Sequence, residues 1–99
     1  MTRLATLALF LACSGTEPAE QPPAFSVLVF SRTTGFRHPS IGPGIQAIRT
    51  LGSARGFAVE ATEDAAAFTD QNLSRFAVIL FLSTTGDVLD NNQQAAMER

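Results

Sequence analysis

The chain has 99 residues, of which 45% are hydrophobic and 16% charged, a composition typical of one globular domain and not of a disordered or fibrous chain. The formal net charge is −2 and all seven basic residues are scattered arginines, so no basic patch forms and nucleic acid is excluded as a partner. A single cysteine, Cys13, rules out an internal disulfide and a cysteine-based metal cluster in this chain.

Residues 1–13 have the layout of a signal peptide. Arg3 precedes an apolar run over residues 4–12, and small residues follow it. This run is well short of the roughly 20 residues that a membrane-spanning helix needs, which favours export with cleavage. The Leu-Ala-Cys ending at Cys13 is similar to a bacterial lipoprotein signal, in which the cysteine is lipid-modified, and ordinary cleavage nearby is the alternative. We therefore expect an exported protein that is periplasmic, or lipid-anchored to a bacterial membrane through Cys13 and facing outside the cytoplasm.

Residues 14–24 are polar, contain a Pro-Pro pair and predict a linker, which a lipid tether would also need. A disordered leader or a buried first strand is the other interpretation of the N-terminal segment. The folded domain is expected over residues 25–99.

The first half of this domain predicts a strand, a helix and a second strand. Residues 25–30 form an apolar run typical of a strand buried on both faces, as in a parallel sheet. Ser40 is a candidate N-cap and Gly56 a candidate stop for the helix between them. Residues 57–61 predict the second strand. The apolar face of the helix is expected to consist of residues spaced three and four apart: Ile41, Ile45, Ile48 and Leu51.

The second half predicts a polar connection, a third strand and a last helix. Residues 62–75 are polar, with a helical turn expected at 71–75. Residues 76–82 give the strongest prediction of a buried strand in the chain. Asp90 and Gln93 have the spacing of a capping box, which predicts a helix that continues to residue 99.

Strands that alternate with helices predict an α/β fold, with right-handed crossovers and a parallel sheet covered on both faces. Three strands and two proper helices are too few to cover such a sheet. We therefore expect the chain to be the N-terminal part of a larger domain, with marginal stability and an exposed sheet edge.

Two loops follow the carboxyl ends of strands, where open parallel sheets bind ligands. They span residues 31–40 and 83–89, and with the strand order 2-1-3 they would face each other across one cleft. The first loop has no P-loop motif, so we exclude nucleoside triphosphate binding. No nucleophile elbow is present either, which excludes a protease or glutaminase nucleophile of the usual kind.

The side chains of these loops allow two interpretations each. His38, the single histidine, could transfer protons or bind a metal, or it could make a loop-structuring hydrogen bond. Arg37 could clamp a substrate oxygen or remain a solvated surface residue. Residues 84–87 could contact substrate or only form a turn. Glu63 and Asp64, in the polar connection, are expected to be solvated.

Three blocks of the sequence together suggest a family. VLVFSRTTGFRHPSI at residues 27–41, FAVEATEDAAAFTD at 57–70 and VILFLSTTGDVLDNNQQAAMER at 78–99 resemble the opening of a ThuA-like domain. That resemblance implies a flavodoxin-like fold, similar to class I glutamine amidotransferases, and a role in trehalose or other sugar metabolism. It also implies that the FRH block and the TTGD block line the cleft.

The sequence thus predicts an exported sugar-related enzyme or sugar-binding protein of this family. His38 would be its acid, base or ligand, and the substrate-binding residues would be Arg37, Thr84, Thr85 and Asp87. The alternative is a non-catalytic carbohydrate-recognition or scaffold module of a larger secreted protein. The expected partner is a small sugar or glycoside, and the sequence indicates neither a cofactor nor a particular metal.

Overall fold

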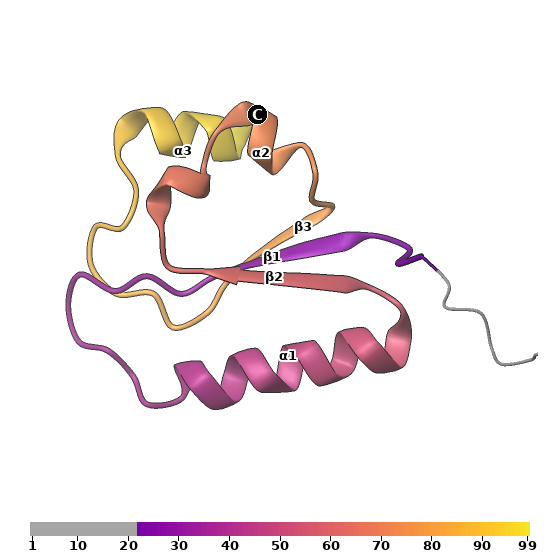
Figure 1. The fold of residues 1–99 in the computed structure, drawn as a ribbon. Helices are drawn as coiled ribbons and strands as arrows, with labels where there is room; N and C mark the ends of the chain where they lie inside the picture. Colours follow the sequence, from indigo (N-terminus) through magenta and orange to yellow (C-terminus); the bar gives the residue numbers. More distant parts are fainter. Residues whose placement is uncertain (1–21) are drawn as a thin grey trace, which may run out of the picture.

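The computed structural model describes residues 22–99, which form a three-stranded parallel sheet with helices on both faces (Figure 1). The predicted signal peptide, Cys13 and residues 14–21 of the predicted linker lie outside the described residues. Within residues 22–99, no helix is both long enough and apolar enough to cross a membrane.

The sheet has the predicted strand order, β2-β1-β3, and all its pairs are parallel. The chain runs from the central strand to one neighbour and then crosses to the other. In register, Phe30 of the central strand lies beside Thr62 on one side and Phe81 on the other. The three strands are β1 (Ser26–Phe30), β2 (Ala58–Thr62) and β3 (Val78–Phe81).

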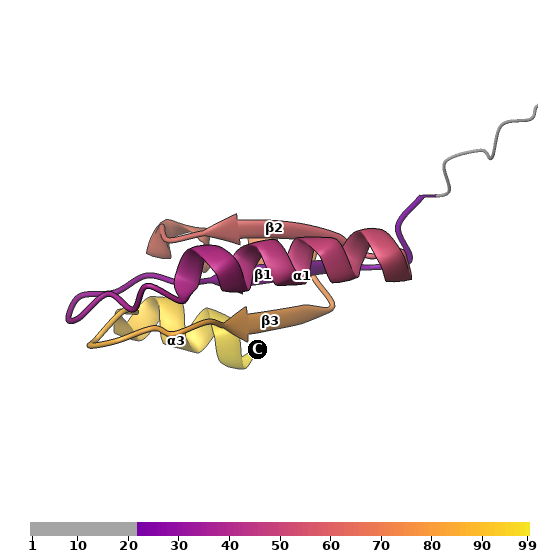
Figure 2. The same cartoon turned by 90° about the horizontal axis from the view of Figure 1, so that it is seen from below.

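The helices lie in two layers, one on each face of the sheet, as the α/β prediction requires. In Figure 1 the long helix α1 (Ile41–Arg55) lies below the sheet, and α2 (Asp70–Leu73) and α3 (Asn91–Glu98) lie above it. Figure 2, seen from below, places α1 in front of the strands. A short 3-10 helix, η1 (Ala65–Ala67), precedes α2 in the connection that was predicted to be mostly polar loop.

Strand β1 is the centre of the hydrophobic core. Its apolar residues 27–30 are all at most 6% exposed. Phe30 packs edge-on against Phe68 and Phe81, with ring centroids 4.7 and 5.6 Å apart. The core on the α2 and α3 face consists of Leu28, Phe30, Ala65, Phe68, Leu73, Leu89 and Ala96.

Strand β3 is less buried than the sequence predicts. Val78 is 44% exposed and Phe81 39% exposed, whereas the apolar run predicted a strand covered on both faces. Strand β3 is exposed because, within the described residues, it pairs only with β1 and lies at the edge of the sheet. An exposed sheet edge was expected, and the strand order 2-1-3 places β3 there.

Helix α1 has nearly the predicted bounds, and its buried face departs from the prediction at one residue. It ends before Gly56, which has a left-handed φ of 84° and donates its N–H to the carbonyl of Gly52. Ile41 is buried, and Ile45 and Ile48 are half-buried, as predicted. Leu51 is 50% exposed, and Gly52 is buried in its place. An ideal Cβ at Gly52 would lie 2.7 Å from the carbonyl oxygen of Phe57, so the helix approaches the second strand too closely there for any side chain.

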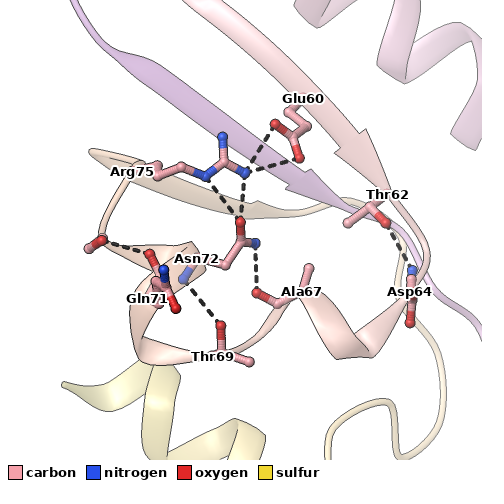
Figure 3. A network of polar contacts seen from close by, with 9 residues as sticks. Glu60, Thr62, Asp64, Ala67, Thr69, Gln71, Asn72 and Arg75 are labelled. Carbon is pink, nitrogen blue, oxygen red and sulfur yellow. Dashed lines mark hydrogen bonds and ion pairs between the residues drawn. The ribbon is translucent and has the colours of Figure 1, made fainter.

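Polar contacts support the ends of the shorter elements. Helix α3 begins with the predicted capping box between Asp90 and Gln93. Figure 3 shows that Arg75 joins two elements, donating to both carboxylate oxygens of Glu60 on β2 and to the side-chain oxygen of Asn72 on α2. Asn72 in turn donates to the carbonyl of Ala67, so the network ties the β2–β3 connection to the sheet.

The close approach at Gly52 makes a stability prediction. Gly52→Ala should lower the free energy of unfolding by about 1–3 kcal/mol, because the added methyl group forces α1 away from β2. Gly42→Ala is the matched control, since a Cβ at that position meets no atom within 4 Å and alanine favours the helix. Urea denaturation followed by circular dichroism measures both, and equal stabilities of the two variants would contradict the prediction.

Candidate functional site

The loops after β1 and β3 meet at the carboxyl edge of the sheet. The chain leaves β1 through α1 toward β2 and later returns to the opposite side of β1 as β3, so the direction of the strand order reverses between β1 and β3. Such a switch point is where open α/β sheets bind ligands. In Figures 1 and 2 both loops extend from the same end of the sheet, at the left of each view.

Hydrogen bonds hold the two loops together. Thr33 and Thr85 form an isolated parallel bridge beyond the ends of the strands. The N–H of Thr34 donates to the carbonyl of Thr85 at 2.9 Å, and the hydroxyl of Thr85 donates to the carbonyl of Phe36 at 2.7 Å. The loops therefore face each other as the strand order predicts, and the hydroxyl of Thr85 joins them.

Gly86 allows this close approach. Its φ is 80°, in the left-handed region that favours glycine. An ideal Cβ at Gly86 would overlap the hydroxyl oxygen of Thr34 and lie 3.4 Å from the backbone nitrogen of Gly35. The spacing of the two loops thus depends on the absence of a side chain at this position.

Two serines meet where α1 begins. Ser40 is the N-cap residue of the helix, as predicted, but its side chain makes no capping hydrogen bond. Its hydroxyl lies instead 3.5 Å from the hydroxyl of Ser83 at the end of β3. Ser83 has a φ of 53°, and it is the single non-glycine residue with positive φ in residues 22–99. Strained backbone of this kind is concentrated at functional sites in proteins.

Arg37 is engaged by a carboxylate. Its Nη1 lies 2.8 Å from each carboxylate oxygen of Glu63, which follows the carboxyl end of β2. Both side chains are about half exposed, so the pair contributes on the order of 0.2–1 kcal/mol. Glu63 was expected to be solvated, and it is about half exposed. Its pairing with Arg37, 26 positions away, has no signal in the local sequence.

His38 lies on the exposed first loop. Its ring meets Phe36 edge-on, with centroids 4.9 Å apart, and its backbone carbonyl accepts the N–H of Ile41 at the start of α1. Within residues 22–99, no side-chain hydrogen bond orients the imidazole. The ring is therefore accessible to a ligand, and its position is set by the backbone.

Asp87 lines a cavity in the region where the sequence predicted a cleft between the two loops, but Arg37 and His38 are not among its lining residues. The cavity has a volume of about 270 Å³, and Asp87 lines it together with Arg32, Val88, Leu89, Asp90 and Gln93. Arg32 is half-buried, and its Nη1 is 3.4 Å from the carbonyl of Val88. The sequence held one signal for the position of Arg32. It lies two residues after Phe30, and side chains two apart in an extended chain point to the same face, here the α3 face. Thr84 is half-buried in the same loop.

The described residues hold no group of three or more His, Cys, Asp or Glu side chains that could bind a metal ion. A protein-family model described as trehalose utilisation, ThuA, matches residues 26–99. The chain belongs to the ThuA family. The match runs from β1 to α3 and so includes both loops of the site, and it confirms the family that the FRH and TTGD blocks indicated. No curated protein and no solved structure matched the chain.

The contact between the loops of this ThuA domain predicts a local effect. Thr85→Val keeps the shape of the side chain but removes the hydrogen bond to Phe36, so amides of residues 34–38 should exchange with solvent about five- to tenfold faster, as expected for a loss near 1 kcal/mol. Thr84→Val is the matched control, because no hydrogen bond of the Thr84 hydroxyl is present within residues 22–99. Equal exchange rates in the two variants, measured by NMR, would show that the Thr85 hydroxyl does not hold the loops.

Proposed function

We propose that this ThuA domain binds and transforms a small sugar, trehalose or a related glycoside, outside the cytoplasm. The observation that carries the proposal is the junction of the two loops at the switch point of the sheet, in a chain of a trehalose-utilisation family. Polar side chains of several chemical types are exposed or half-buried there, as recognition of a polyhydroxylated ligand requires.

The proposed roles follow from what each group can do chemically. His38 exchanges a proton with a sugar hydroxyl or ring oxygen, because imidazole both donates and accepts near neutral pH. Arg37, held by Glu63, donates to sugar oxygens from a restricted position. Thr84, Thr85 and Asp87 form the opposite side of the site on the loop after β3.

A second candidate is a non-catalytic carbohydrate-recognition or scaffold module. One observation favours it: within residues 22–99, no carboxylate or carbonyl bonds to the His38 ring, whereas catalytic histidines are commonly oriented by such a partner. Binding of sugar without turnover would support this candidate over the enzyme.

His38 provides the test between the two candidates. If the domain is an enzyme, His38→Ala should reduce turnover of the sugar by about 10²–10⁴-fold, the usual contribution of a general acid or base. Stability should change by less than about 0.5 kcal/mol because the side chain is exposed. The measurement is product formation from a panel of glycosides by chromatography, with a thermal melt of each variant.

Arg55→Ala serves as the control for this test. Arg55 is exposed in the last turn of α1, at the far end of the helix from the loops, so turnover should not change. Unchanged turnover in His38→Ala would remove His38 from the mechanism. Sugar binding with no turnover by the wild-type chain would instead identify a recognition module.

The proposed location outside the cytoplasm has its own test. In a bacterial host the wild-type chain should be recovered with the membrane fraction, and Cys13→Ala should shift it to the soluble fraction, because the lipid would have no attachment site. Metabolic labelling with a fatty-acid analogue, followed by fractionation and immunoblotting, measures this. Equal labelling of both variants, or none in either, would contradict lipidation and leave ordinary cleavage as the route of export.

A further inference from the structure

We propose that Arg32 and Asp87 form the principal sugar-binding pair, in the cavity between the loop after β1 and the start of α3, and that this subsite selects an uncharged sugar. The assignment deepens the proposed function and rests on it. It adds to Arg37 a second arginine, which the sequence did not single out, and assigns the larger share of the affinity to the pair of Arg32 and Asp87.

The two side chains offer complementary hydrogen-bonding groups to one space. A guanidinium has five N–H donors, and Arg32 uses one of them in a long contact of 3.4 Å to the carbonyl of Val88. The carboxylate of Asp87 has no hydrogen-bond or ion-pair partner within residues 22–99, so its acceptor positions are available. Each sugar hydroxyl is both a donor and an acceptor, so adjacent hydroxyls can bridge such a pair.

The remaining lining groups restrict what the cavity can accept. Asp90 also lines it, with its carboxylate accepting the N–H of Gln93 at 2.8 Å in the helix cap. One guanidinium and two carboxylates give the lining a formal charge of −1. A negative lining repels a phosphate or carboxylate and leaves a neutral sugar unaffected.

The size of the cavity is consistent with one sugar ring. Its volume of about 270 Å³ is just below the range of roughly 300–1,000 Å³ that is typical of small-molecule sites. The lining is mainly polar, with Val88 as its half-buried apolar residue, which suits a ligand rich in hydroxyl groups. A disaccharide would place one ring in the cavity and extend the other out of it.

Arg37 and His38 lie outside this lining. The guanidinium of Arg37 is paired with Glu63, on the β2 side of the site, whereas the cavity lies on the β3 and α3 side. A sugar held by Arg32 and Asp87 therefore depends less on Arg37 than on this pair for its affinity.

The test compares binding of trehalose and trehalose 6-phosphate to the full chain by isothermal titration calorimetry. The wild type should bind trehalose and bind its phosphate at least about tenfold more weakly. Asp87→Asn, which keeps the side-chain shape, should weaken trehalose binding by about tenfold or more and reduce the discrimination against the phosphate. Arg32→Lys should also weaken trehalose binding, because lysine keeps the positive charge but lacks the planar set of N–H donors of the guanidinium. Arg37→Ala should weaken trehalose binding less than Asp87→Asn does, and Arg55→Ala, in the last turn of α1 far from both loops, should leave the affinity unchanged.

The outcomes separate this inference from the proposed function. If the wild type binds trehalose but Asp87→Asn binds it equally well, or the phosphate binds as tightly as the neutral sugar, the subsite assignment is wrong and the proposed function stands. A larger loss in Arg37→Ala than in Asp87→Asn would return the role to Arg37. If neither trehalose nor any glycoside of a wider panel binds, the proposed function fails and the subsite with it. Circular dichroism of each variant shows that weakened binding does not come from unfolding.

Discussion

Strand β1 is hydrogen-bonded on both edges and covered on both faces, and the positions of the other elements follow from it. Its residues pair in parallel with β2 and with β3, and its side chains alternate between the α1 layer and the layer of α2 and α3. Both neighbours run parallel to β1, so each connection must be a crossover that passes over one face and returns the chain to the starting end of the sheet. All three strands therefore have their carboxyl ends at the same edge. The loops that carry the polar side chains are gathered there as a direct result.

The same edge divides into two electrostatic halves. On the β2 side, Arg37 and Glu63 neutralise each other in a half-exposed pair. On the β3 side, Arg32 and Asp87 border a cavity without forming an ion pair within the described residues. A pair that is already satisfied gains little by exchanging its partner for a sugar hydroxyl, whereas groups still open to solvent gain a defined partner when a ligand binds. The two halves therefore differ as binding surfaces because the charged groups of one already have partners and those of the other do not.

Local sequence patterns were enough to predict the fold but not the details of packing. Gly56, the Asp90–Gln93 box and the three apolar runs predicted the helices and strands because each signal acts within a few residues. The strand order also agreed, since few arrangements of this pattern are physically accessible. Leu51 was misplaced because helical periodicity says which residues share a face but not how closely that face approaches the sheet.

The sequence predicted where the loops of the candidate site lie, but not which of their side chains contact each other. The switch-point rule located both loops, and their side-by-side arrangement followed from the strand order. The ion pair of Arg37 with Glu63 and the cavity beside Arg32 depend on contacts between segments far apart in the chain. Local sequence indicates at most the direction of the Arg32 side chain, not these contacts. Which of these residues bind substrate stays a prediction.

The overlap that a side chain at Gly86 would create with Thr34 links two positions that are 52 residues apart in sequence. Neither can vary alone toward larger residues without separating the loops, and a smaller residue at position 34 would make room at position 86 while leaving the cost of its left-handed backbone. The effect of substituting both positions together should therefore differ from the sum of the two single effects. In the divergence of such domains, the pair would change together or stay as it is.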